Sequence, residues 1–152
     1  MTTTIKNPAD LLGYVGQDLG TSGWLEVPQS DINLFAEATH DHQWIHTDPE
    51  RARGGPFGGP IAHGYLTLAL LIPLWSEILV ISDLGLAVNY GLNKVRFPAP
   101  VPAASRVRLT ARLAGAEEVN GGGVQATVDA VMERDGGDKP VCVAQMVHRY
   151  YA

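Results

Sequence analysis

Residues 35–75 read FAEATHDHQWIHTDPERARGGPFGGPIAHGYLTLALLIPLW, and the rest of the chain is interpreted from this stretch. Its first thirty positions carry four of the five histidines, the acidic residues Asp41, Asp48 and Glu50, and a run of glycines and prolines. Its last eleven positions are the longest nearly unbroken apolar stretch of the protein. Titratable groups gathered just ahead of a helix that must be buried indicate a site built at the N-terminus of that helix.

The apolar stretch predicts one long helix from Gly64 to about Ile81, apolar on all faces and therefore wrapped on all sides. It almost reaches the length of a membrane span, but it contains Pro73, Ser76 and Glu77, and the mean hydropathy of the chain is +0.01. We therefore expect a buried helix and no membrane segment.

After residue 84 the apolar period changes from that of a helix to two, which is typical of strands with one buried face. In 105–115, for example, Val107, Leu109 and Leu113 alternate with arginine and threonine, and Gly91 in an earlier strand is a candidate bulge. The expected strands are 86–97, 105–115, 123–134 and 141–151. A helix wrapped by an antiparallel sheet gives the α+β class, as a single domain over residues 1–152.

Shorter elements are expected ahead of the long helix. They are a short helix or turn at 8–15, a glycine-punctuated loop at 16–23, a strand at 24–27, a helix from its cap Ser30 to Thr39 or His40, a loop or tight turn at 41–46, and a helical turn at 48–52 capped by Asp48. The glycine- and proline-rich segment 54–60 cannot be regular structure and can lie close to a ligand.

Composition narrows the possible functions. A hydrophobic content of 45% over 152 residues fits one globular domain, and a net charge of -5 argues against a general nucleic-acid binder. The N-terminus lacks a signal-peptide pattern, and the only cysteine, Cys142, fits a reducing compartment. We therefore expect a cytoplasmic protein.

Three segments carry a resemblance to a known family. They are F-A-x-A-T-x-D-x-x-x-I-H-x-D-P-x-x-A at 35–52, G-P-F-G-x-P-I-A-H-G at 55–64, and V-R-F-P-A-P-V at 95–101. In this order they resemble the MaoC-like (R)-specific enoyl-CoA hydratases, whose fold is the hot-dog fold. One departure is Gln43-Trp44, where many members have Asn-Pro.

The resemblance implies the reversible hydration of a trans-2-enoyl-CoA thioester to an (R)-3-hydroxyacyl-CoA. No cofactor or metal is expected. A homodimer is expected because pairing two sheets edge to edge is one way to cover their edge strands. It implies that Asp41 and His46 activate one water and that the Gly64 N–H holds the thioester oxygen. A carboxylate and a neutral imidazole suit proton transfer near neutral pH, and a helix N-terminus suits a developing negative charge.

The expected substrate contacts come from three parts of the chain. They are Gln43, Ile61, Ala62, His63, Asn89, Tyr90, Arg96, Pro98, Ala99 and Pro100. His63 is also open to a purely structural role beside the loop. Lys94 and Arg96 stand beside the segment that the family places near the CoA chain, whereas Arg106, Arg108 and Arg112 fit one solvated face of a strand.

Other functions stay open at this point. A hot-dog thioesterase would share the fold but hydrolyse the thioester, and a non-catalytic partner subunit would keep the fold without the acids. A metal-binding protein could use His40, His42, His46 and His63 as ligands. Without a motif, Asp41 could be only a turn residue, His46 a core histidine, and Cys142 core.

Overall fold

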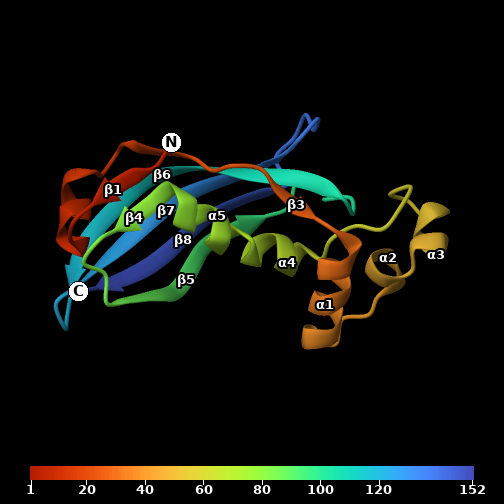
Figure 1. Ribbon diagram of the computed structural model, residues 1–152, viewed down its shortest axis with the longest axis horizontal. Coiled ribbons are helices and arrows are strands. Elements are labelled where there is room, and N and C mark those ends of the chain that lie inside the picture. The colour runs from red at the N-terminus through yellow and green to blue at the C-terminus, as the bar shows by residue number, and fades with distance from the viewer.

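The computed structural model describes residues 1–152 and is dominated by a long antiparallel sheet (Figure 1). Its main strands are β5 (Leu86–Arg96), β6 (Ser105–Val119), β7 (Gly123–Arg134) and β8 (Cys142–Tyr151). The order is β2-β6-β7-β8-β5, with β2 (Asp18–Thr21) at one edge and β3 (Leu25–Val27) also paired with β6. The α+β class, the four long strands and the register shift at Gly91 are confirmed.

Two helices lie against the concave side of this sheet, α4 (Gly64–Ala69) and α5 (Leu71–Ile78) (Figure 1). The prediction of one continuous helix to Ile81 is wrong. Pro73 has no N–H to offer the carbonyl of Ala69, so the helix is interrupted at Leu70, one turn before the proline.

The end of that predicted helix is a strand instead. β4 (Leu79–Ile81) pairs in parallel with β1 (Thr3–Ile5) and forms a separate two-stranded sheet. The sequence of neither short segment predicts this pairing. The helices are also not buried on every side, because Tyr65 is 75% exposed, while Leu71, Leu74 and Ile78 are fully enclosed.

Two local predictions near the N-terminus need correction, and a third is confirmed. The glycine-punctuated loop contains β2, and Gly20 takes a positive φ of 138° where a Cβ would meet the Met1 carbonyl. Helix α1 (Gln29–Thr39) begins one residue after Pro28, so Ser30 is inside the helix and does not cap it. The 3₁₀ helix η1 (Pro8–Gly13) confirms the expected short helix.

The loop predicted at 41–46 contains a one-turn helix, α2 (Trp44–Thr47). It is followed by α3 (Pro49–Arg53), where the Asp48 carboxylate accepts a hydrogen bond from the Arg51 N–H, as its predicted capping role requires. With α1, these short helices project beyond one end of the sheet (Figure 1).

The core lies between the sheet and α5. The inward residues of β6 and β7, among them Leu109, Leu113 and Met132, are fully buried together with Cys142. Burial raises the pKa of the Cys142 thiol to about 11, which makes it an inert core residue.

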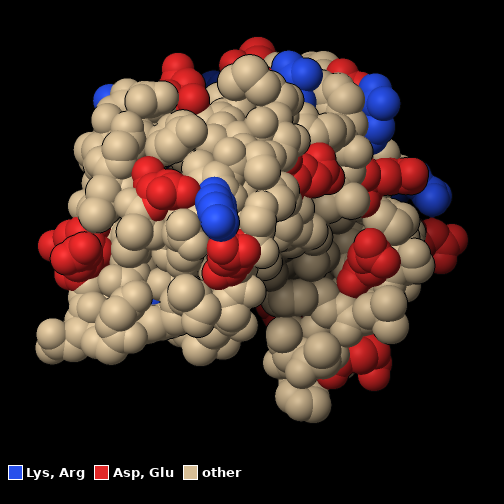
Figure 2. Space-filling model, turned by 60° about the vertical axis from the view of Figure 1, so that its left-hand side comes forward, with Lys and Arg blue, Asp and Glu red and all other residues tan.

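The outward arginines of β6 are paired with acidic residues on the hairpin partner. Arg106 contacts Asp135, and Arg108 and Arg112 contact Glu133 and Asp129. On the face shown in Figure 2, acidic side chains are scattered and no broad basic patch forms. None of the helices is both long and apolar enough to cross a bilayer.

Candidate active site

The polypeptide turns sharply where α1 ends, and this turn places Asp41. His40 ends the helix in the left-handed conformation, with a φ of 64°. The Asp41 side chain is exposed, and the one hydrogen bond to its carboxylate is a long contact of 3.4 Å from the Gln43 N–H. The carboxylate therefore remains available to a ligand or to water.

His46 lies on α2 and is 6% exposed. Its Nδ1 is 2.7 Å from the carbonyl oxygen of Ile61, and a carbonyl can only accept, so Nδ1 must carry the proton. Nε2 is then the basic atom of the ring. The Gln29 amide donates to the His46 carbonyl over 2.7 Å and ties α2 to α1.

Burial is the main reason why the pKa of His46 is lowered from its ordinary value of 6.5. The hydrogen bond to Ile61 opposes this shift, nearby His63 adds to it, and nearby Asp41 opposes it. At neutral pH the ring is therefore neutral, which is the state a general base needs.

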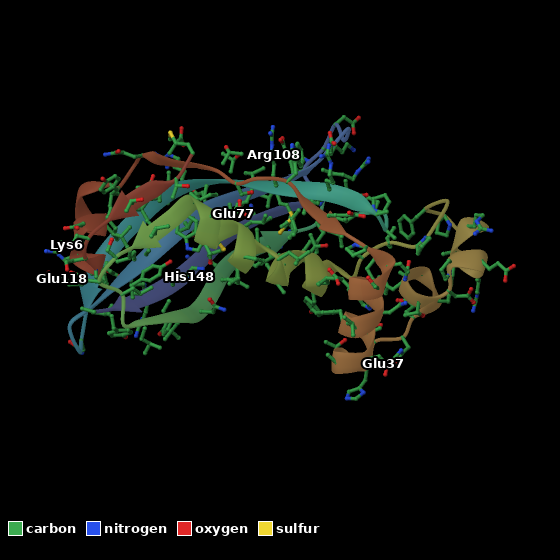
Figure 3. All side chains as sticks on the ribbon, in the orientation of Figure 1. Lys6, Glu37, Glu77, Arg108, Glu118 and His148 are labelled. Atoms are coloured by element: carbon green, nitrogen blue, oxygen red, sulfur yellow. The ribbon has the colours of Figure 1, made fainter.

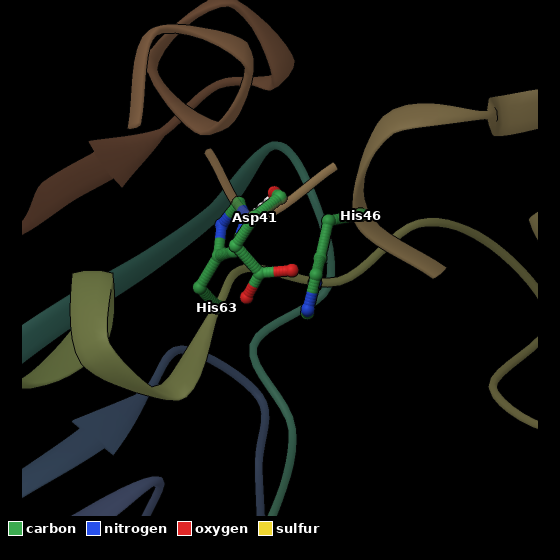
Figure 4. Close-up of side chains that lie close together, drawn as sticks. All are labelled: Asp41, His46 and His63. Atoms are coloured by element: carbon green, nitrogen blue, oxygen red, sulfur yellow. Dashed lines mark hydrogen bonds between the residues drawn. The ribbon is translucent and has the colours of Figure 1, made fainter. Parts of the chain in front are cut away.

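Asp41, His46 and His63 converge on one point (Figure 4). One polar side-chain atom from each lies within 4.8 Å of the others. The rings of His46 and His63 stack, with centroids 3.9 Å apart and an interplanar angle of 25°. A carboxylate and a neutral imidazole that share such a small space can hold one water between them.

Gly64 is the first residue of α4, as predicted. No backbone or side-chain group of the protein accepts a hydrogen bond from its N–H, which agrees with its place in the unpaired first turn of a helix. A Cβ at this position would meet the Phe97 ring at 3.0 Å, so the glycine keeps the approach to its N–H open.

A cavity of about 320 Å³ opens beside Gly64. Its walls include five of the residues expected to contact substrate. They are Ile61, Ala62, Pro98, Ala99 and Pro100. The antiparallel bridge between Ile61 and Pro102 and the hydrogen bond from the Ala62 N–H to the Val101 carbonyl, 2.8 Å long, hold the two segments together.

The other expected contacts lie elsewhere. Asn89 and Tyr90 are on β5; Asn89 lines two different cavities, and Tyr90 stacks under the Arg149 guanidinium. Arg96 is exposed and donates to the Val95 carbonyl. Gln43 is exposed and precedes α2, where its carbonyl accepts from the His46 N–H.

Several site residues escaped the sequence analysis. Phe57, Thr67, Phe97, Val101 and Val141 also line the cavity beside Gly64. Of these residues, Thr67 could have been predicted from helical spacing. It lies one turn beyond His63, and its hydroxyl donates to the His63 carbonyl over 3.2 Å.

The departure at Gln43-Trp44 is accommodated away from the converging side chains. The Trp44 ring lies under the Arg51 guanidinium at 4.4 Å and against Gly55, where a Cβ would be only 2.9 Å from the ring. The glycine therefore makes room for the tryptophan.

The four-histidine ligand set does not assemble. His40 and His42 are exposed, and the compact group holds only His46 and His63, together with Asp41. One nitrogen of each buried ring already faces a backbone carbonyl. A metal would have to use the remaining two nitrogens and the carboxylate.

Comparison with known proteins agrees with this geometry. Residues 11–135 match the MaoC-like domain. The chain belongs to the MaoC-like dehydratase family. The 3-hydroxyacyl-thioester dehydratase Z of Mycobacterium tuberculosis (strain ATCC 25618 / H37Rv) is 54% identical over 149 residues, which cover 98% of this chain and 99% of the relative. Nodulation protein N of Rhizobium leguminosarum bv. viciae is 42% identical over 91% of this chain and 88% of its own length.

Solved structures of this family share the fold. The Archaeoglobus monoamine oxidase regulatory protein superposes with a TM-score of 0.78 at 23% identity and covers 99% of this chain and 97% of its own. The (R)-hydratase from A. caviae superposes with a TM-score of 0.71 at 22% identity, over 88% and 94%. The expected hot-dog fold is confirmed, and the chain is an enzyme of a dehydratase family. That the domain spans all of residues 1–152 stays a prediction.

Proposed function

We propose that this protein is an (R)-specific enoyl-CoA hydratase, which adds water reversibly across the double bond of a trans-2-enoyl thioester. The observation that carries the proposal is the free Nε2 of a neutral, buried His46 close to the exposed Asp41 carboxylate. These two groups would both accept hydrogen bonds from one water, which orients its oxygen toward C3 of the substrate.

The proton transfers that the reaction requires fit this pair. As the water oxygen forms its bond to C3, one proton passes to the Asp41–His46 pair, and a proton from the pair is delivered to C2. The double bond is lost, and the hydroxyl and the hydrogen both come from the water. Delivery from one site places both on the same face of the substrate, which supports a single stereoisomer.

The thioester oxygen becomes negative during the addition and needs a donor. The unpaired Gly64 N–H supplies one, and the cavity beside it has the volume of a small-molecule site. Its apolar walls would hold the thioester and its carrier arm. The name of the Mycobacterium relative, a 3-hydroxyacyl-thioester dehydratase, supports the same reaction in the reverse direction.

Incubation with crotonyl-CoA tests the proposal. The enoyl absorbance should fall, the product should be (R)-3-hydroxybutyryl-CoA by chiral analysis, and Asp41→Asn should reduce the rate by ~10²- to 10⁴-fold. Glu37→Gln is the matched control, since Glu37 is an exposed carboxylate on α1 whose one ion pair is with His42. Equal turnover by wild type and Asp41→Asn would contradict the role of Asp41, and release of free thiol without hydration would point to a thioesterase.

The homodimer is part of the proposal. β5 is an edge strand of eleven residues, one side of which has no hydrogen-bonding partner, and its apolar side chains Leu86, Val88, Tyr90 and Leu92 are all exposed. A second copy paired along this edge would cover both the strand and these side chains. Sedimentation should give a dimer, and Val88→Asp with Leu92→Asp should give monomers. A monomeric wild type would contradict the pairing.

A cytoplasmic setting fits the same picture. The single cysteine, Cys142, is buried and unpaired, as is usual in a reducing compartment.

A further inference from the structure

His63 makes three contacts that leave it no access to substrate. It precedes α4, is 2% exposed, and its Nε2 lies 3.0 Å from the backbone carbonyl of Asp41. One face of its ring stacks on His46, and Phe35 packs against the ring with centroids 4.8 Å apart. The ring is thus enclosed by the residues it touches.

The tautomer of His63 follows from these contacts. The Asp41 carbonyl can only accept, so Nε2 carries the proton. Nδ1 then holds a lone pair, is sealed from solvent, and has no hydrogen-bond partner in the protein. His63 is not among the residues that line the cavity beside Gly64.

The contact with Asp41 matters because little else holds that residue. Its carboxylate has only the long contact from Gln43, and the chain enters it from His40 in the left-handed conformation. The hydrogen bond from His63 therefore fixes the main chain from which the carboxylate projects. The His63 ring also packs against one face of the His46 imidazole.

We propose that His63 is a positioning residue, which holds the Asp41 backbone and the His46 ring in the one arrangement where both can bind the same water. This inference rests on the proposed hydratase function and sharpens it. It also replaces the expected substrate contact of His63 with an indirect role.

Two substitutions separate the parts of this role. His63→Phe keeps a flat ring for stacking but loses the donor to Asp41, whereas His63→Gln keeps an N–H donor and loses the stacking. His63→Phe should lower kcat by ~10²-fold with little change in KM, since misplacing a catalytic group by about 1 Å has this cost. His63→Gln should keep more activity. His42→Gln, at an exposed histidine next to Asp41, should behave as wild type.

A second readout does not depend on turnover. The imidazole of His46 is faced by two titratable groups, Asp41 and His63, and removal of His63 removes the one that lowers its pKa. An NMR titration should therefore show the His46 pKa rising in His63→Phe. Circular dichroism establishes that each variant is folded.

The outcomes are distinct. Loss of kcat in His63→Phe with recovery in His63→Gln and a raised His46 pKa supports positioning. Wild-type kcat in His63→Phe, or a raised KM with unchanged kcat, overturns it. If wild type hydrates no enoyl thioester, the proposed function fails, while an unchanged His46 titration in folded His63→Phe overturns the positioning role separately.

Discussion

His46 donates its Nδ1–H to the Ile61 carbonyl over 2.7 Å, and this contact leaves Nε2 as the only basic atom of the ring. Ile61 also lies on the wall of the cavity beside Gly64, so this contact ties the His46 ring to the cavity wall. Burial keeps the pKa of this imidazole below 6.5.

Hydration should therefore be independent of pH near neutrality and should fall at acidic pH as His46 takes up a proton. The acid limb of kcat/KM for crotonyl-CoA should lie below pH ~6.5. His46→Gln should lower kcat by ~10²- to 10⁴-fold and remove that limb. An acid limb at or above pH 7, or one that persists unchanged in His46→Gln, would assign the titrating base to another group.

Gly64→Ala tests the helix N-terminus. The added methyl group would meet the Phe97 ring at 3.0 and 3.2 Å, and this ring is 40% exposed and free to move aside. The free energy of unfolding should change by less than ~1 kcal/mol. The value of kcat/KM should fall by up to ~10²-fold, the effect of losing one oxyanion donor, because the methyl narrows the approach to the N–H.

Gly59→Ala is the control, since it lies in the glycine-rich loop ahead of α4 and a Cβ there has no neighbour within 4 Å. It should match wild type in both activity and stability. An unaffected kcat/KM in Gly64→Ala would show that the thioester oxygen does not use this N–H.

The sequence predicted best those elements whose side-chain period is enforced by burial. In β6 and β7 successive residues face the core and solvent in turn. Val107 and Leu109 are buried, while Arg108 between them points outward, so the alternation is visible in the sequence. β1 and β4 have three residues each and pair across more than seventy positions, which no local pattern encodes.

The residues of the candidate site also fall into those that the sequence predicted and those that it did not. Asp41 and His46 follow a motif and lie in one cluster with His63, and Gly64 begins α4. The contact between His63 and the Asp41 backbone could not be predicted, because a hydrogen bond to a main-chain carbonyl leaves no trace in the identity of its acceptor residue. Asn89 was expected at the same cavity, but its strand carries it to two others along α5.

Trp75 and Tyr150 form a buried polar pair that can be tested for stability alone. The indole N–H donates to the Tyr150 hydroxyl over 2.7 Å, and burial raises the pKa of this hydroxyl to about 12. Tyr150→Phe leaves the indole N–H without a partner and should cost about 1 to 3 kcal/mol in urea unfolding. Tyr151→Phe, a half-buried neighbour with no hydrogen bond from its hydroxyl, should change little. Equal losses would show that ring packing, not the hydrogen bond, is being measured.

His148 should make the fold sensitive to acid. Its side chain lies on β8 facing α5, is 5% exposed, and has no hydrogen-bond partner in the protein (Figure 3). Burial lowers its pKa from 6.5, so the folded state binds this proton less readily than the unfolded state does. The free energy of unfolding should therefore be fully retained above pH ~6.5 and fall as the pH drops below it.

His148→Leu removes this titration, because the leucine cannot bind a proton in either state. Urea unfolding at pH 7.5 and pH 5.5 should show a smaller loss in the variant than in wild type, with the remaining loss including that from His46, whose pKa is also lowered. His42→Gln, at an exposed position, should keep the wild-type loss. An equal loss in His148→Leu and wild type would mean that the folded protein admits the proton at His148 without cost, as happens when water or a neighbouring carboxylate reaches the ring.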